Sequence, residues 1–187
     1  MTNEAVPRRD TAAPLAYPDA LIRDVLTTTE SIALVGASSN PARPSFIVMK
    51  YLLGRGFEVI PINPGQAGGE ILGRRVYARL ADLDRPVDMV EIFRNSAAAG
   101  PIVDDALALE PKPRTIWMQL SVRNDEAAAR AEAAGVRVVM DRCPKIEFGR
   151  LSGEISWQGV NSRVLSARKP TRAAGGVQKL TLGPKRS

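Results

Sequence analysis

The stretch SIALVGASSNPARPS, residues 31–45, decides the fold class of this chain. It begins with a short continuous apolar run, which is the pattern of a strand covered on both faces. Gly36 then permits a sharp turn, and small residues with hydroxyl groups follow it. Because backbone amides near a helix start attract anions, this turn predicts a phosphate site. Simple structural turning explains the same pattern about as well.

Strand and helix patterns alternate along the rest of the chain. Short apolar segments typical of strands lie at residues 57–62, 87–93, 114–120 and 136–140. Segments with helical spacing or helix caps lie at residues 17–26, 45–56, 96–111 and 124–135. The alternation predicts an α/β fold, a Rossmann-like three-layer sandwich with a parallel sheet of about five strands.

Length and composition predict one domain. The chain has 187 residues, 44% of them apolar, which is enough to bury one core. We expect a flexible N-terminal segment at residues 1–16, the folded domain at residues 17–149, and a basic, disordered tail at residues 150–187. From Arg163 onward the tail holds seven basic side chains and no acidic one. Its composition cannot offset chain entropy by burial, so any attraction to nucleic acid or another polyanion would be weak.

The compartment follows from one cysteine and the N-terminal sequence. A single cysteine cannot form an intrachain disulfide, and the first twenty residues contain no apolar run to serve as a leader or membrane span. These features predict a cytoplasmic protein without a membrane partner.

The fold predicts where a ligand binds. In open parallel sheets, ligands lie beyond the carboxyl ends of the strands, where the strand order reverses. The segments to weigh therefore follow the predicted strands, at residues 36–40, 63–66, 93–94, 119–122 and 141–145. The first of these lacks the second and third glycines of the dinucleotide fingerprint, and the second offers no carboxylate for a ribose hydroxyl. Binding of plain NAD is disfavoured.

Several ordered motifs carry a family resemblance. VGASSNPARPS, VIPINP, PVDMVEIFR, TIWMQLSV and EAAARAEAAGVRVVMDRCPKIE together resemble the small stand-alone CoA-binding domain proteins, whose fold is that of the N-terminal domain of the succinyl-CoA synthetase alpha subunit. The resemblance covers roughly residues 18–149. It implies non-catalytic binding of coenzyme A or an acyl-CoA through the adenosine phosphates, with no catalytic residue and no metal site.

The resemblance also implies which residues hold the ligand. The residues that match the family's phosphate-binding segment and the positions beside it are Gly36, Ala37, Ser38, Ser39, Asn40, Arg43 and Ser45. The adenosine end matches the turn at Asn63, Pro64 and Gly65, where ligase relatives carry a nearby lysine and this chain has Gln66. The pantetheine arm matches Gln119, Leu120 and Ser121.

Two of these side chains have ordinary structural alternatives. Phe93 either stacks on or packs beside adenine, or it is a core aromatic at a strand end. Ser45 is also a good N-cap for the helix that follows it.

Cys143 raises a separate question. It lies beside Arg142 and Lys145, and two interpretations are open: a reactive thiol whose pKa these cations lower, or a half-buried small residue, which general grounds favour. The carboxylates Glu91 and Asp141 are present, but no spacing between carboxylates names a reaction.

Two enzyme functions remain as alternatives. One is the CoA-binding subunit of an acyl-CoA ligase completed by an unidentified partner chain. The chain cannot be such a ligase by itself, because the succinyl-CoA synthetase relatives pass phosphate through a histidine and this sequence contains none. The other is an NADP-dependent oxidoreductase with Arg43 near the 2′-phosphate.

Overall fold

The computed structural model describes residues 15–153, and expectations for residues 1–14 and 154–187 lie outside them. The α-helices, strands and short 3₁₀ helices (η) follow one another along the chain in this order: α1 (Asp19–Thr28), β1 (Ser31–Val35), α2 (Pro44–Gly54), β2 (Glu58–Ile62), η1 (Pro64–Gln66), β3 (Glu70–Ile71), β4 (Arg74–Arg75), η2 (Leu80–Asp82), β5 (Met89–Ile92), α3 (Ser96–Leu107), β6 (Thr115–Met118), α4 (Asp125–Ala133), β7 (Arg137–Val139) and α5 (Pro144–Leu151).

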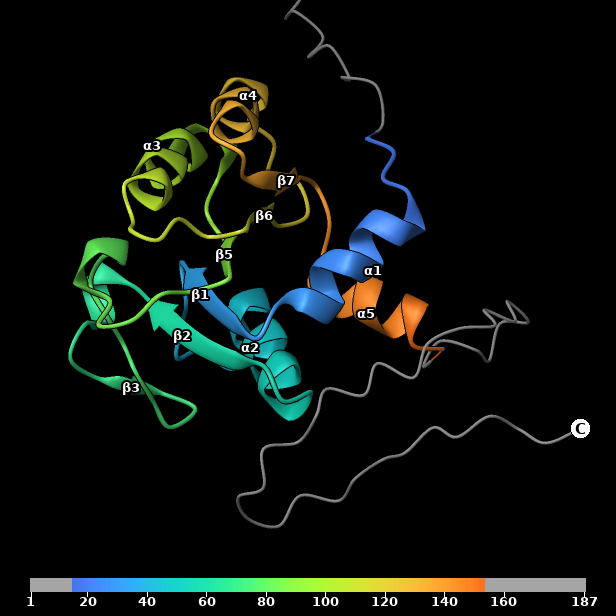
Figure 1. The fold of residues 1–187 in the computed structure, drawn as a ribbon. Coiled ribbons are helices and arrows are strands. Elements are labelled where there is room, and N and C mark those ends of the chain that lie inside the picture. The colour runs from blue at the N-terminus through green and yellow to red at the C-terminus, as the bar shows by residue number, and fades with distance from the viewer. Residues whose placement is uncertain (1–14, 154–187) are drawn as a thin grey trace, which may run out of the picture.

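The main sheet has five parallel strands in the order β2-β1-β5-β6-β7 (Figure 1). Val35 at the end of β1 lies opposite Ile62 of β2 on one side and Ile92 of β5 on the other. The chain moves outward to β2, then returns to the other side of β1 for β5, so the strand order reverses between β1 and β5. The predicted parallel α/β sandwich is confirmed, with its switch point at the end of β1.

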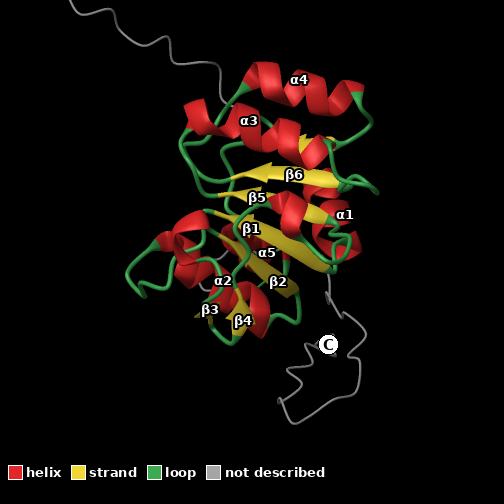
Figure 2. Ribbon diagram, turned by 90° about the vertical axis from the view of Figure 1, so that its left-hand side faces the viewer, coloured by secondary structure: helices red, strands yellow, loops and turns green. Residues whose placement is uncertain are grey.

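Helices cover both faces of this sheet (Figure 1 and Figure 2). Ile32 and Leu34 of β1 face a core shared with α1, α2 and α5. Ala33, between them, faces the second core, which is shared with α3 and α4. Alternation along a strand thus supplies two apolar layers, as the continuous apolar runs of the sequence require.

The helix caps agree only in part with the sequence expectation. Asn124, the first residue of the helical segment expected at residues 124–135, caps α4, and its Oδ1 accepts a hydrogen bond from the amide of Ala127 at 2.9 Å. Ser45, expected as an N-cap, is instead buried inside the first turn of α2, and the N-cap residue is Arg43. The helix begins two residues earlier than a Ser45 cap implies, because Pro44 fits the first helical position.

Helix α5 is absent from the sequence expectation. It starts after Cys143 with a proline in its first turn and continues to Leu151, past the domain boundary expected at residue 149. Phe148 packs edge-on against Tyr51 of α2 and Phe57, with ring centroids 6.2 and 5.9 Å apart.

The segments at the two ends of the described chain are joined. The hydroxyl of Tyr17 accepts a hydrogen bond from the amide of Met140 at 2.8 Å. The guanidinium of Arg142 donates to the carbonyl oxygen of Leu15 at 2.5 Å. Arg150 of α5 forms an ion pair with Asp19 of α1 at 2.7 Å. We call these three contacts the terminal clasp: two of them tie the residues before α1 to the segment after β7, and the ion pair ties α1 to α5.

Candidate functional site

At the switch point, the backbone of Phe93 after β5 lies very close to Gly36 after β1. This residue has φ 91°, and a Cβ atom there would lie 2.7 Å from the carbonyl oxygen of Phe93. The amide of Phe93 donates in turn to the carbonyl oxygen of Val35 at 2.8 Å. Only glycine combines this backbone conformation with so close an approach of the neighbouring strand.

The turn after Gly36 exposes fewer amides than the sequence suggests. The amides of Gly36 and Ala37 both donate to the carbonyl oxygen of Ile62, at 2.9 and 3.3 Å, and Ala37 is buried. The amide of Ser39 donates to Oε1 of Gln66 at 3.1 Å. Ser38 is half-buried and both Ser39 and Asn40 are exposed, so these three residues are the part of the turn that can meet a ligand.

Asn63 joins this turn to the end of β2. Its Nδ2 donates to the carbonyl oxygen of Ala37 at 2.7 Å, and its Oδ1 accepts from the amide of Gly65 at 2.9 Å. With both ends of the amide engaged, Asn63 fixes the shape of the turn. Pro64 starts η1, which carries Gln66 toward Ser39.

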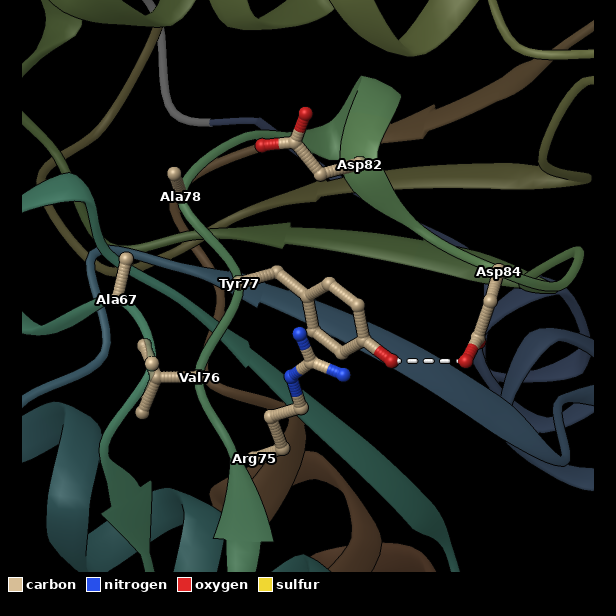
Figure 3. A pocket seen from close by; sticks show the side chains of 8 residues that line it. Ala67, Arg75, Val76, Tyr77, Ala78, Asp82 and Asp84 are labelled. Carbon is tan, nitrogen blue, oxygen red and sulfur yellow. Dashed lines mark hydrogen bonds between the residues drawn. The ribbon is translucent and has the colours of Figure 1, made fainter.

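A cavity of about 360 Å³ lies beyond the end of β2 (Figure 3). We call it the Tyr77 cavity; the residues that line it are Ala67, Gly68, Arg75, Val76, Tyr77, Ala78, Asp82 and Asp84. The hydroxyl of Tyr77 donates to Asp84 at 3.0 Å, a bond that raises the pKa of the tyrosine. The guanidinium of Arg75 lies 5.3 Å from the centre of the Tyr77 ring.

Sequence reasoning missed Tyr77. A parallel bridge to Ile62 brings it to the end of β2, where its carbonyl oxygen accepts from the amide of Asn63 at 2.9 Å. The hairpin of two very short strands, β3 and β4, separates Ile62 from Tyr77 in the sequence, so no local sequence pattern predicts their pairing.

A second, mostly apolar cavity of about 480 Å³ lies on the other side of β1. We call it the Gln119 cavity; the residues that line it are Pro44, Val48, Phe93, Arg94, Asn95, Gln119, Leu120, Ser121, Val122 and Cys143. It brings together five residues chosen from the sequence, which follow three different strands: Phe93, Gln119, Leu120, Ser121 and Cys143. The lining is buried at Gln119 and Cys143 and exposed at Leu120.

The backbone beside this cavity is strained. Ser121 and Asp141 have φ 65° and 53°, in the left-handed region that residues other than glycine seldom adopt. The amide of Ser121 donates to Oδ1 of Asp141 at 2.7 Å, which ties the two strained positions together. The bond fixes the segment after β6 against the segment after β7.

Arg43 and Ser45, also chosen from the sequence, line neither cavity. Arg43 is exposed at the start of α2, and its amide donates to the carbonyl oxygen of Asn40 at 3.0 Å. Its side chain lies near the turn in sequence but outside both pocket walls. Ser45 is 5% exposed, so it supports the helix rather than the surface of the site.

Cys143 is a buried thiol, 6% exposed. Burial raises its pKa, and the nearby carboxyl group of Glu91 adds to the rise, whereas a hydrogen bond from the Gln119 side chain opposes it. The reactive interpretation, which needed a lowered pKa, is therefore wrong, and the structural interpretation of Cys143 as a small residue packed out of solvent is the one that agrees. Arg142 bonds instead to Leu15, and Lys145 lies over the ring of Tyr51.

Glu91 is a carboxyl group inside an apolar layer. It is fully buried between Leu34 and Trp117 on the adjacent strands. Its Oε1 accepts a hydrogen bond from Nε2 of Gln119 at 3.1 Å, and its Oε2 has no hydrogen-bond partner within the described part of the chain. Burial raises the pKa of Glu91 to about 8, although the bond from Gln119 works against the rise.

Between residues 15 and 153, no three histidine, cysteine or carboxylate side chains gather where they would hold a metal ion. No helix in this part of the chain has the length and apolar character needed to cross a membrane.

Comparison with known proteins gives relatives of two sizes. A family model described as a CoA binding domain matches residues 30–149. The uncharacterized protein YneT of Bacillus subtilis (strain 168) is 34% identical over 125 residues, which are 67% of this chain and 90% of YneT. The structure of a hypothetical protein from Pyrococcus horikoshii OT3 is 37% identical with a TM-score of 0.69, and the match covers 73% of this chain and 94% of that one.

A larger protein contains a similar unit. The dinucleotide-forming acetyl-coenzyme A synthetase 1 of Ca. Korarchaeum cryptofilum, solved in complex with phosphate and ADP, is 25% identical with a TM-score of 0.50. The match covers 60% of this chain and 26% of the synthetase. The domain therefore occurs both as most of a small protein and as a quarter of a large one.

Proposed function

Because this chain belongs to the CoA binding domain family, we propose that it binds coenzyme A or an acyl-CoA without transforming it. The observation that carries the proposal is the placement of two cavities on opposite sides of the turn after β1. Coenzyme A has the same division, with adenosine at one end, a pantetheine arm at the other and a pyrophosphate between them. The adenosine then occupies the Tyr77 cavity and the pantetheine arm the mostly apolar Gln119 cavity.

The turn between the cavities suits the phosphates. Gly36 lets the chain turn close to the backbone of Phe93, and the hydroxyls of Ser38 and Ser39 are at the surface. A phosphate oxygen can replace Oε1 of Gln66 as the acceptor for the amide of Ser39. Arg43, at the start of α2, supplies a cation on one side of the turn.

The wall of the Gln119 cavity supports binding rather than catalysis. Arg94 is the one charged residue among those that line it, and the rest are apolar, amide, hydroxyl or thiol side chains. General acid–base catalysis needs a titratable group within hydrogen-bond reach of the reacting atoms. A wall of this composition holds an apolar arm and offers little to its thioester end.

Calorimetric titration with CoA, dephospho-CoA, NAD and NADP tests the proposal. We expect measurable binding of CoA, weaker binding of dephospho-CoA, and hardly any binding of NAD. Tighter binding of either nicotinamide dinucleotide than of CoA would instead favour the oxidoreductase. Indifference to all four ligands would refute the proposed function and leave only the fold.

The likeness to the acetyl-coenzyme A synthetase favours a second candidate, the CoA-binding subunit of a ligase completed by a partner chain. Purified protein incubated with ATP, CoA and acetate distinguishes the two. The binding proposal predicts that no acetyl-CoA forms from the chain alone. It also predicts that none forms after addition of a lysate from a strain that lacks the gene for this chain. Acetyl-CoA that forms only when both are present would establish the subunit.

A further inference from the structure

Arg75 is the one cation that lines the Tyr77 cavity. The central carbon of its guanidinium lies 5.3 Å from the centre of the Tyr77 ring, so the ring holds the guanidinium at the cavity wall (Figure 3). Between residues 15 and 153, no carboxylate forms an ion pair with Arg75. The wall therefore offers a ligand one guanidinium that this part of the chain does not neutralise.

The two carboxylates in the same wall already have partners. Asp82 accepts from the guanidinium of Arg79 at 2.9 Å and from the amide of Arg79 at 3.0 Å. Asp84 accepts a hydrogen bond from the hydroxyl of Tyr77 at 3.0 Å, at the far end of the ring (Figure 3). Since Arg79 offsets the charge of Asp82 and Asp84 is bonded to Tyr77, Arg75 is left to an anion that enters the cavity.

The hairpin of β3 and β4 fixes the place of Arg75. The amide of the next residue, Val76, donates to the carbonyl oxygen of Gly69 at 2.9 Å. Glu70 lies opposite Arg75 in the register of the two strands, but the described side chains form no ion pair with each other. Successive side chains of a strand point to opposite faces, and Arg74, which precedes Arg75 on β4, does not line the cavity.

The other cations of the candidate site lie away from this cavity. Arg94 lines the Gln119 cavity, and its Cδ lies 3.0 Å from the position that a Cβ atom would take at Gly36. Arg43 is exposed at the start of α2 and lines neither cavity. Both are therefore closer to the turn that suits the pyrophosphate, whereas Arg75 lies on the adenosine side.

We propose that Arg75 binds the 3′-phosphate on the ribose of coenzyme A and makes the site selective for ligands that carry this phosphate. This inference rests on the proposed function, because the adenosine must first occupy the Tyr77 cavity. A phosphate monoester carries about −1.5 to −2 charges near neutral pH. A guanidinium can donate two parallel hydrogen bonds to such a group, which gives both affinity and a fixed orientation.

This contact gives the site a basis for rejecting related nucleotides. Dephospho-CoA and NAD carry a neutral hydroxyl where coenzyme A carries the 3′-phosphate, so they offer Arg75 no charge to pair with. NADP carries its extra phosphate on the 2′-oxygen of the ribose. The cation of the adenosine cavity therefore distinguishes coenzyme A from ligands that share its adenine, its ribose and its pyrophosphate.

The test is a cycle of two changes, one in the protein and one in the ligand. Wild-type protein and Arg75→Ala are titrated with CoA and with dephospho-CoA by calorimetry at one ionic strength, because salt screens ion pairs. We expect Arg75→Ala to weaken binding of CoA by about tenfold or more. Binding of dephospho-CoA should stay within about twofold of the wild type, because the lost partner is already absent from that ligand.

Three further variants serve as controls in the same titrations. Arg74→Ala removes the neighbouring cation on the other face of β4 and should leave the preference for CoA as it is in the wild type. Arg43→Ala and Arg94→Ala should weaken the two ligands equally if these cations act on the pyrophosphate. A variant of Arg43 or Arg94 that abolishes the preference, while Arg75→Ala keeps it, would overturn the inference.

Equal losses of CoA and dephospho-CoA in Arg75→Ala would also overturn it, because Arg75 would then act on a part that both ligands share. A circular dichroism melt establishes whether Arg75→Ala is folded, and Arg75→Gln, which keeps a long polar side chain without charge, replaces it if it is not. The wild-type titrations separate the two proposals. CoA and dephospho-CoA that bind equally well remove only this inference, whereas CoA that does not bind removes the proposed function as well.

Discussion

The position that a Cβ atom would take at Gly36 lies 2.7 Å from the carbonyl oxygen of Phe93, where β1 and β5 end side by side. Real Cβ atoms do not approach a backbone oxygen so closely, and Gly36 also has φ 91°. The switch point of the sheet therefore depends on one residue having no side chain.

Gly36→Ala should lower the free energy of unfolding by about 2–4 kcal/mol, because it adds a strained conformation to a steric clash. It should also weaken CoA binding, since the turn must move away from Phe93. Denaturant unfolding and calorimetry measure the two effects. Gly54→Ala is the control, because a Cβ atom there meets nothing within 4 Å, and it should be neutral or slightly stabilising.

Arg43→Ala should weaken CoA binding by about ten- to a hundredfold if the guanidinium pairs with a phosphate. The loss should be smaller for dephospho-CoA if the partner is the 3′-phosphate. Lys50→Ala removes a cation from the same helix at an exposed position, and it should change neither affinity. Equal losses in the two variants would mean that the helix contributes only general positive charge.

Tyr77→Ala should weaken binding of CoA and of adenosine 3′,5′-bisphosphate by about tenfold, because the ring offers a stacking surface for adenine. Tyr77→Phe keeps the ring and loses the hydrogen bond to Asp84, so its affinity should stay close to that of the wild type. Pantetheine, which lacks the adenosine, should bind all three proteins alike. A loss of pantetheine binding in Tyr77→Ala would show that the ring does not act through contact with adenine.

Glu91 should make the stability of the protein depend on pH. The unfolded chain ionises this carboxyl near its ordinary pKa of about 4.3, whereas the folded protein keeps the proton up to about pH 8. Between these values ionisation favours the unfolded chain, so the free energy of unfolding should fall by about 1.4 kcal/mol per pH unit and level off above.

Glu91→Gln should remove that component of the slope, because the amide does not ionise. Urea unfolding of both proteins at several pH values between about 5 and about 8 gives the comparison. The control Glu132→Gln changes an exposed carboxyl on α4 and should leave the slope as it is in the wild type. Parallel curves for the wild type and Glu91→Gln would show that Glu91 is ionised in the folded protein.

Local sequence patterns predicted most of the sheet, because strands buried on both faces leave continuous apolar runs such as residues 31–35 and 115–118. Asn124 was also predictable as a cap, because an asparagine directly before a helical segment is a common N-cap. Ser45 was not, because Pro44 competes with it for the start of α2. Helix α5 was missed, since its apolar residues are few and its packing depends on α1 and α2.

The residues of the candidate site also divide into those that local sequence patterns predicted and those that depend on long-range contacts. Phe93, Gln119, Leu120, Ser121 and Cys143 follow strands, and the ends of parallel strands must meet, so their gathering at one cavity was predictable. Tyr77 reaches the site through a long-range bridge to Ile62 that no local pattern encodes. The reactive interpretation of Cys143 failed because sequence proximity to Arg142 and Lys145 says nothing about where their side chains point.

The terminal clasp makes this domain a self-contained insert. Because α1 and α5 are held together by Arg150 and Asp19, and residues 15 and 142 by a hydrogen bond, the chain enters and leaves the fold at neighbouring points. A unit with adjacent entry and exit can be placed within a longer polypeptide with little disturbance to either. The same geometry suits the domain to evolutionary transfer between small proteins and large multidomain enzymes.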